Sequence, residues 1–324
     1  QVQDTMNLHP GDVYAETLRR KSVEALINQY GELGYLETQV TIDRLFHDNE
    51  PKVDLQVKIE EGTPSKAGRV IVRGNSLTKD KVILRQLRGI EPDRRLNRQG
   101  IETTQRRLEG STLFSEAKVT VLGEPGDEYR DVLIEVKEGN TGSINFGAGV
   151  SSDAGVVGAI DLTQRNFDIA DWPDSVGEFF TGRAFRGAGQ RFQIALQPGD
   201  EFSRYSVSFR EPYLFESDYF FDSNFRYFAR EREDWEEERL GGSFSIGQRF
   251  GDLWSARVQI RAEEVDITDV EPDAPVDAFE VEGENQITSA GLAVVRATTD
   301  SRIFPTRGSR LTLGVSRAGA LGGD

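Results

Sequence analysis

The sequence predicts two small α+β domains of order β-α-α-β-β, followed by an antiparallel transmembrane β-barrel that is incomplete, with about nine strands. Three observations carry this prediction. Up to about residue 140, segments with helical spacing alternate with strand-like segments. Beyond it, apolar residues recur almost everywhere with a period of two, which is the spacing of a strand with two different faces. The polar faces carry large charged residues beside glycine and serine, as a water-filled barrel lumen does.

The charges are distributed unevenly along the 324 residues. The net charge is −16, and the part before residue 141 holds 21 basic and 24 acidic residues, against 18 and 31 in the rest. A chain this acidic has no general electrostatic affinity for nucleic acid, and no nucleic-acid partner is expected. The chain has no cysteine and two histidines, which excludes the usual zinc sites. We expect no metal and no cofactor.

The first domain is expected over residues 1–62, where the order lacks its first strand. A run of apolar residues with helical spacing predicts a helix over residues 11–35. Two strands are expected to follow, in residues 38–46 and 53–59, because apolar and polar residues alternate there and the turn DNEP separates them.

The second domain is expected over residues 63–140 and has the complete order. RVIVRGN reads as a strand, and Thr78 is expected to cap a helix over KDKVILRQLRG. Asn97 is expected to cap a second helix that ends near Leu108. The segments AKVTVLG and DVLIEVKEG then predict a pair of strands on either side of a turn.

Residues 141–324 are expected to form the N-terminal part of the barrel. The pattern is clearest in LWSARVQIRAEE, where apolar residues alternate with polar or charged ones. The strands of a soluble β-sandwich alternate as well, so the period alone does not separate the two folds.

Three features favour the membrane barrel over a soluble, adhesin-like β-protein. The large charged residues at positions that a lumen would hydrate are Arg191, Arg226, Arg257, Arg261 and Glu263. The aromatic residues near strand ends, where a membrane interface would lie, are Tyr213, Phe215, Tyr219, Phe220 and Trp254. The two most acidic connections, residues 229–240 and 265–285, fall on the same side of the sheet when successive strands alternate in direction.

Several motifs, in the same order over nearly the whole chain, resemble one known family. LHPGDVY with INQYGELGY resembles the helical part of a POTRA domain, and VIVRGNSLTKDKVILRQLR with LEGSTLFSEAKV resembles the last POTRA domain before a barrel. VKEGNTGSINFGAGVSSDAG resembles the junction into a first barrel strand, and FREPYLF resembles a barrel turn. The chain is thus similar to the BamA-type outer-membrane protein assembly factors. This resemblance implies a barrel in the outer membrane of a Gram-negative cell, with POTRA domains in the periplasm.

The sequence departs from the family pattern in three respects. It lacks a secretion signal, and about nine strands do not close a single-chain barrel, because an open edge in lipid leaves backbone groups unpaired. We therefore expect a fragment of a longer chain.

The triplet Val72-Arg73-Gly74 lies in a POTRA strand turn and is not the barrel-loop motif of the family. Where the family has a short periplasmic turn, this chain has an insertion over about residues 169–185. We expect its aromatic residues to cover local apolar surface, or to pack under the barrel or against the last POTRA domain. These residues are Trp172, Phe179, Phe180 and Phe185.

The resemblance implies that the first barrel strand is the working site. In this family, that strand separates from the last strand at a lateral gate, and a strand of an unfolded client pairs with it. The residues expected to form this template are Gly142, Ser143, Ile144, Asn145, Phe146, Gly147, Ala148 and Gly149. Glycine adds no cross-strand packing and loses more entropy on ordering, so the pairing is expected to be weak and able to open. The alternative interpretation is that the glycines relieve crowding in the lumen.

The resemblance implies insertion of β-barrel proteins into the outer membrane, without enzymatic catalysis. The implied partners are unfolded outer-membrane β-barrel proteins, outer-membrane lipid and accessory assembly lipoproteins, which in the family bind the last POTRA domain. Candidate docking residues for the lipoproteins are Arg73, Arg85 and Arg88, whose alternative role is to form a solvated surface. A POTRA-bearing secretion or translocation pore has the same architecture, so the fold alone does not separate the two functions.

Overall fold

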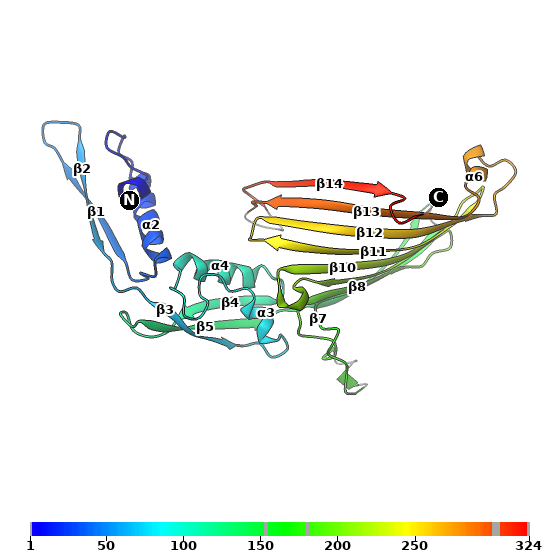
Figure 1. Cartoon of the computed structure of the whole chain (residues 1–324), viewed down its shortest axis with the longest axis horizontal. Coiled ribbons are helices and arrows are strands. Elements are labelled where there is room, and N and C mark those ends of the chain that lie inside the picture. The colour runs from blue at the N-terminus through cyan, green and yellow to red at the C-terminus, as the bar shows by residue number, and fades with distance from the viewer. Residues whose placement is uncertain (1, 152–154, 176, 179–181, 300–304, 323–324) are drawn as a thin grey trace. The chain divides into compact units, whose positions relative to one another are not determined.

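The computed structural model describes residues 2–151, 155–175, 177–178, 182–299 and 305–322. The chain divides into two compact units, Gln1–Asn140 and Thr141–Asp324, and Figure 1 labels most of their elements. The first unit combines helices and strands, and the second consists mainly of strands. Within the described residues, no helix combines the length and the apolar character needed to cross a lipid bilayer.

The first unit begins with a helical segment packed on a β-hairpin. Its elements are α1 (Val2–Thr5), α2 (Glu16–Glu32), β1 (Gln39–Phe46) and β2 (Val53–Glu60). The two strands pair antiparallel over their whole length, as their alternating pattern predicts. A small core that includes Leu26 and Ile42 joins α2 to the hairpin. Helix α2 is shorter than the expected 11–35 because Ala15 before it is extended and Gly34 after it has a φ of 97°.

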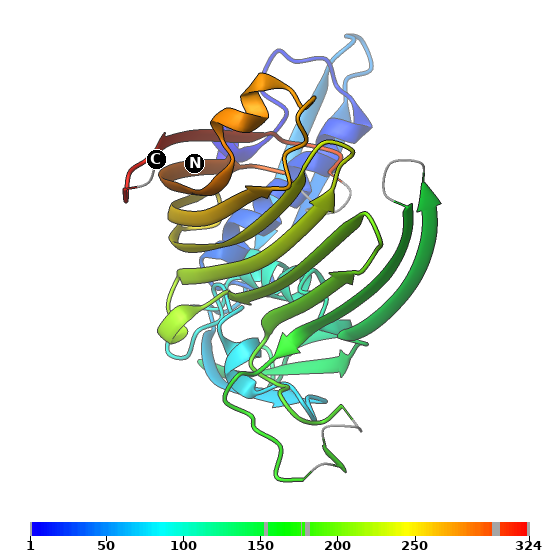
Figure 2. The ribbon, with the colours of Figure 1, turned by 90° about the vertical axis from the view of Figure 1, so that its right-hand side faces the viewer.

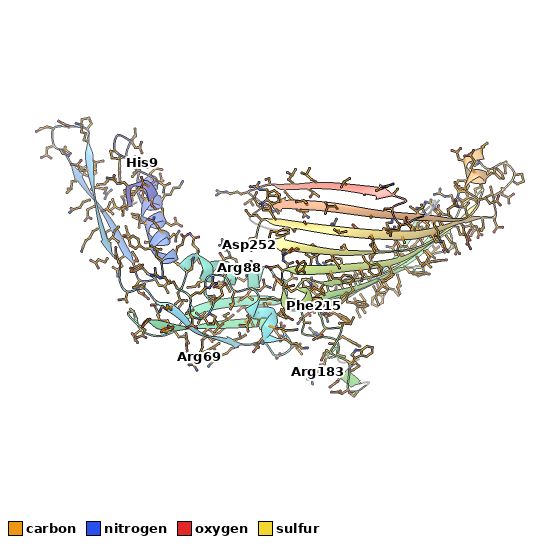
Figure 3. All side chains as sticks on the ribbon, in the orientation of Figure 1. His9, Arg69, Arg88, Arg183, Phe215 and Asp252 are labelled. Carbon is orange, nitrogen blue, oxygen red and sulfur yellow. The ribbon has the colours of Figure 1, made fainter. Side chains whose placement is uncertain are left out.

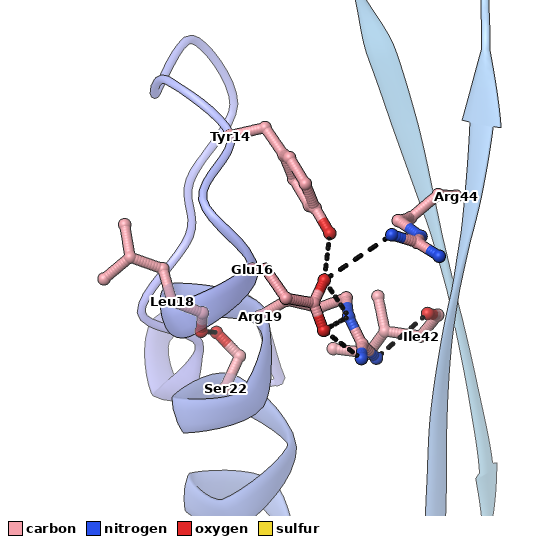
Figure 4. A network of polar contacts seen from close by, with 7 residues as sticks. All are labelled: Tyr14, Glu16, Leu18, Arg19, Ser22, Ile42 and Arg44. Carbon is pink, nitrogen blue, oxygen red and sulfur yellow. Dashed lines mark hydrogen bonds and ion pairs between the residues drawn. The ribbon is translucent and has the colours of Figure 1, made fainter.

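The carboxylate of Glu16 connects α2 to β1 (Figure 4). Tyr14 Oη donates a hydrogen bond to Glu16 Oε2 at 2.6 Å, and Arg19 Nη2 donates one to Glu16 Oε1 at 2.6 Å. Arg44 of β1 forms an ion pair with the same carboxylate, with 3.6 Å between Nη1 and Oε2. The hydrogen bonds from Arg19 and then Tyr14 lower the pKa of Glu16 from 4.5 to about 2.

The rest of the first unit is a three-stranded sheet with two helices. Its elements are β3 (Lys66–Arg73), α3 (Asp80–Leu84), α4 (Arg98–Glu109), β4 (Phe114–Val121) and β5 (Tyr129–Glu138). The central strand β5 pairs in parallel with β3 and antiparallel with β4. One core unites the helices with the sheet, and it includes the fully buried Ile83, Leu108, Val132 and Ile134. The order β-α-α-β-β predicted for this segment is confirmed.

One of the two predicted helix caps is correct. The Asn97 side chain accepts a hydrogen bond from the Gly100 amide at 3.0 Å and begins α4. The prediction for Thr78 is wrong, because α3 begins after Lys79, which makes no side-chain cap. The Thr78 amide instead donates to Glu138 Oε1 at 2.6 Å.

Glu138, at the end of β5, holds the loop that precedes α3. Its carboxylate accepts hydrogen bonds from the Ser76 hydroxyl at 2.7 Å and from the backbone amides of Leu77 and Thr78. Partial burial raises the pKa of Glu138, but the hydrogen bonds from Ser76, Thr78 and Leu77 outweigh burial, and the net pKa is lowered.

Polar contacts join the two parts of the first unit. The Arg130 guanidinium, which is nearly buried, forms an ion pair with Glu37. The Ser65 amide donates to the Gly34 carbonyl at 3.0 Å. Helices α2 and α4 approach so closely that a Cβ on Gly31 would lie 2.7 Å from Arg98 Cβ. The hairpin part and the three-stranded part therefore contact each other through side chains and backbone.

The second unit is one antiparallel sheet of nine strands. Its strands are β6 (Gly142–Ser151), β7 (Gly155–Phe167), β8 (Gln190–Gln197), β9 (Phe202–Glu211), β10 (Tyr219–Glu231), β11 (Glu236–Phe250), β12 (Trp254–Thr268), β13 (Gly283–Ala297) and β14 (Arg310–Ala318). Each strand pairs with its neighbours in sequence order. Figure 2 shows that the sheet curves and that its edge strands β6 (green) and β14 (red) remain apart. A single curved sheet is an incomplete barrel wall, since a sandwich requires two packed sheets.

Short helices occur in the described parts of the connections, where the sequence predicted none. Those with defined bounds are η1 (Leu214–Glu216) and α6 (Val276–Glu280), the latter within the acidic stretch between β12 and β13. Both are a single turn long or little more, so they leave no helical period in the sequence.

The two faces of the sheet differ as the alternating pattern predicts. The register places Phe146 beside Ile160, and Phe244 beside Ile260, on one largely exposed apolar face. On the opposite face, Glu263 is buried and pairs with Arg226, with 3.0 Å between Arg226 Nη2 and Glu263 Oε2, and with Arg261. Glu237, on the same polar face, is buried as well, and burial of charged side chains is expected on the concave side of a curved sheet rather than on its open side.

Phe220 corrects the expectation that the aromatic residues near strand ends lie at a membrane interface. Phe215, Tyr219 and Trp254 are exposed, but Phe220 is buried. Its ring covers Gly247, where a Cβ would lie 2.2 Å from Phe220 Cζ. The glycine leaves space that the ring of the neighbouring strand fills.

Candidate functional site

Strand β6 forms one edge of the curved sheet. Among the described residues its one partner strand is β7, with a continuous register from Gly142 opposite Gln164 to Ser151 opposite Gly155. All eight residues expected to form the template, 142–149, lie within β6. The backbone groups on its other side therefore form an edge that another strand can pair with.

Within the part of the chain that the structure describes, sterics do not require the glycines of β6. There, a Cβ on Gly149 would meet no atom within 4 Å, and a Cβ on Gly147 would lie 3.5 Å from Ala159 Cβ. At Gly142 the nearest atom would be Gln164 Nε2, also at 3.5 Å. These are ordinary van der Waals distances. Among the described residues, crowding on the polar face therefore does not explain the glycines at Gly147 and Gly149, which lie on that face.

The apolar face of β6 is open. Phe146 is 77% exposed, and Ile144 and Val150 are also exposed. Their partners on β7 are the apolar residues Leu162, Ile160 and Val156. A strand that pairs with the free edge of β6 would extend this apolar surface, because side chains of adjacent strands share a face.

The hairpin of β6 and β7 has few bonds to the rest of the sheet at its far end. Strand β7 pairs regularly with β8 over residues 160–164. Beyond Ile160, the backbone contacts among the described residues are an isolated bridge between Val157 and Gly199 and a hydrogen bond from the Gly158 amide to the Pro198 carbonyl at 2.8 Å. This end of the hairpin is therefore less restrained than the end near Gly142.

The other end of β6 is anchored by residues that the sequence did not indicate. Thr141 is buried, and its hydroxyl accepts a hydrogen bond from Arg186 Nη2 at 2.8 Å. Its carbonyl accepts a second hydrogen bond from the Arg165 amide at 2.9 Å. Arg186 lies 45 residues further along the chain, so no local period or motif connects it with Thr141.

The three arginines considered for docking lie close in sequence but differ in surroundings. Arg73 is exposed at the end of β3, and Arg85 follows α3 and is half-buried. Arg88 is also half-buried, and its Nη1 donates to the Leu87 carbonyl at 2.7 Å. Figure 3 labels Arg88 among the side chains of this domain.

The comparisons with known proteins cover most of the chain. Residues 184–324 match the Omp85 superfamily domain, and residues 1–62 and 65–139 match POTRA, described as a surface antigen variable number repeat. The outer membrane protein assembly factor BamA of Nitratidesulfovibrio vulgaris is 26% identical over 303 residues, which are 92% of this chain and 36% of that protein. The chain spans about a third of the length of the curated relatives it matches.

Two solved structures share the fold. The crystal structure of BamA from Haemophilus ducreyi lacking POTRA domains 1-3 matches with a TM-score of 0.66 and 18% identity, over 96% of this chain and 59% of that one. CdiB from Escherichia coli matches with a TM-score of 0.50 and 11% identity, over 96% of this chain and 55% of that one.

These findings define the class of protein. The chain belongs to the Omp85 superfamily, among the members that carry POTRA domains. Within this class, its curated relatives are outer membrane protein assembly factors of the BamA type. Its strands accordingly belong to the cell outer membrane and its POTRA domains to the periplasm.

Proposed function

We propose that this chain contains the client-binding edge of an outer-membrane insertase, and that β6 is the template. In hydrocarbon, a strand is stable only when its backbone N–H and C=O groups are paired. An unfolded outer-membrane protein therefore needs an edge to pair with as it enters the membrane. Main-chain hydrogen bonds supply affinity that depends little on the client's sequence, so one edge serves many clients.

The combination of an edge position with glycines that sterics do not require carries this proposal. Gly147 and Gly149 have room for a Cβ among the described residues, and a β-branched residue there would strengthen the pairing with β7. Glycine weakens that pairing instead. An edge strand with weak pairing to its neighbour is expected where the hydrogen bonds between strands must break and form again with a client.

The proposal assigns a role to each part of the chain. Residues 1–62 would be a POTRA domain without its first strand, residues 63–140 the last POTRA domain, and residues 141–324 the N-terminal part of the barrel. The POTRA domains would receive unfolded β-barrel proteins in the periplasm, and accessory lipoproteins would dock near Arg73, Arg85 and Arg88. The apolar face of the sheet would contact outer-membrane lipid. No step requires a catalytic residue.

A photo-crosslinking experiment tests the template. The photoreactive residue benzoylphenylalanine replaces Phe146 in the complete protein in cells, and Leu292 in the control. Leu292 lies on the same apolar face but in β13, between two paired strands. We expect client adducts at position 146 and not at position 292. Equal adducts at both positions, or adducts at position 292 alone, would contradict the assignment of β6.

Depletion of the complete protein separates insertion from export. An insertase serves many unrelated clients, so its loss is expected to lower the amounts of many outer-membrane β-barrel proteins at once. Loss of a single secreted protein, with the other barrel proteins unchanged, would instead identify a secretion pore. Quantitative proteomics of the outer membrane and of the culture medium measures both outcomes.

A further inference from the structure

The connection between β7 and β8 presents large apolar side chains to solvent. In Figure 1 the described part of this connection extends away from the sheet, below its left-hand end, and Figure 3 labels Arg183 on it. Trp172 is 74% exposed, and Ile169 is 53% exposed. Phe179 and Phe180, also expected to contribute here, lie outside the described residues. Large apolar side chains exposed together in one segment indicate a contact surface.

An aromatic row connects this segment with the apolar face of the sheet. Trp172 meets Phe185 edge to face, with ring centroids 5.2 Å apart. Phe185 stacks on Phe167 at 5.7 Å, and Phe167 stacks on Phe192 at 4.8 Å. Phe192 lies opposite Phe209 on the apolar face. Ring-to-ring contacts therefore link the connection with the apolar face of the sheet.

The backbone holds Phe185 in place for this stacking. Phe185 has a φ of 55°, which is unfavourable for a residue other than glycine. Hydrogen bonds fix it on both sides: its amide donates to the Asp171 carbonyl at 2.8 Å, and its carbonyl accepts from the Asp168 amide at 2.9 Å. The orientation of the row is thus determined by the local fold.

We propose that Ile169, Trp172 and Phe185 form a membrane-surface anchor that contacts phospholipid at the periplasmic boundary of the outer membrane. Strand β7 ends beside the start of β6. Strand β6 comes directly after the periplasmic POTRA domains in the sequence, so this end of the sheet is the periplasmic one. The apolar face of the sheet faces hydrocarbon, and the aromatic row continues it at headgroup level, where tryptophan is favoured. This inference holds for an insertase and for a pore.

The charge of the segment specifies the kind of lipid contact. Residues 168–189 contain four acidic and two basic residues, so attraction to anionic headgroups does not drive binding. The anchor therefore depends on apolar and aromatic contact, and zwitterionic phospholipid alone should suffice.

Depth-dependent fluorescence quenching tests the anchor. Trp172→Cys is labelled with an environment-sensitive dye in the complete folded protein, with any cysteine outside residues 1–324 replaced by serine, and reconstituted in phosphatidylcholine vesicles. The matched control is Val276→Cys, which is 72% exposed at α6 in an acidic connection at the opposite end of the strands. A lipid quencher near the headgroup should lower the fluorescence at position 172 about twofold, and a quencher near the chain end should lower it less. Neither should affect position 276.

Two results would overturn the proposal. Fluorescence at position 172 that is quenched by aqueous iodide, like that at position 276, would place the segment in water. Protection from both iodide and lipid quenchers would show that another protein surface covers it. Barrel folding is checked by the mobility of unheated samples on gels. If Trp172→Cys does not fold, Ile169→Cys gives the same readout from the neighbouring exposed position.

Discussion

Glu16 and Glu138 show how single carboxylates connect neighbouring elements in the POTRA part of the chain. Glu16 joins α2 to β1, and Glu138 joins β5 to the loop before α3. Both accept hydrogen bonds from partners that the unfolded chain does not hold in place, so folding favours their ionised forms and lowers their pKa values. Each therefore couples stability to pH in a way that experiments on single residues can detect.

Replacing Arg19 by methionine should raise the pKa of Glu16 from about 2 towards 4.5, because the hydrogen bond from Arg19 is the largest cause of the lowered pKa. With the folded pKa below the unfolded one, the stability contributed by Glu16 is complete above about pH 4.5 and is lost as the pH falls through about 2. Carboxyl NMR titration of the unit Gln1–Asn140 measures the change. Arg20→Met, an exposed neighbour on α2, is the control and should leave the pKa of Glu16 near 2.

Replacing Glu138 by alanine should lower the free energy of unfolding by about 1–2 kcal/mol, because several hydrogen bonds to a charged acceptor are lost at once. The loop before α3 should become mobile as its amides lose their acceptor. Denaturant unfolding of the unit Gln1–Asn140 gives the free energy, and amide exchange at Leu77 and Thr78 reports the loop. Glu135→Ala changes the same charge on the same strand at an exposed position and should cost less. Equal losses would contradict the assigned role.

At the scale of elements, the alternation of apolar and polar residues predicted where the strands lie. It did not predict contacts between residues far apart in the sequence. VDLQVKI and LWSARVQIRAEE became β2 and β12 because alternation is a local property that each strand carries in its own residues. The misplaced cap at Thr78 had a distant cause, since the partner of its amide, Glu138, lies 60 residues away. The template residues were located by a motif, but the space around Gly147 and Gly149 and the anchor between Arg186 and Thr141 required the fold.

Filling the glycines of β6 should strengthen its pairing and impair its function. In Gly147→Val/Gly149→Val, the Cβ of each new side chain has room among the described residues, and the two valines should stabilise the β6–β7 pairing by about 0.5–1 kcal/mol. We expect lower amounts of client barrel proteins in cells, although the variant itself folds and inserts. Gly314→Val on β14, where a Cβ also has room, is the matched control and should be silent. Normal client levels in the double variant would mean that a loosely paired β6 is not needed.

At the scale of the whole molecule, the two parts of the first unit should behave as one body. Arg130 and Glu37 pair across their junction, the Ser65 amide binds the Gly34 carbonyl, and Gly31 lets α2 approach Arg98. Contacts of three kinds at one junction restrict rotation more than a single flexible linker would. An extended client that passes along both domains would then meet surfaces at a fixed spacing.

Replacing Arg130 by methionine should uncouple the two domains. The change leaves Glu37 without its partner at a nearly buried site, which should cost about 2 kcal/mol and widen the range of angles between the domains. Small-angle X-ray scattering of the unit Gln1–Asn140 should then show a larger maximum dimension, and its thermal unfolding should begin earlier. The control is Arg69→Met, labelled in Figure 3, which removes the same charge from an exposed pair with Asp131 in the same domain. If both variants scatter like the unsubstituted unit, the ion pair does not set the angle, and the backbone contact at Ser65 and the close approach at Gly31 must set it instead.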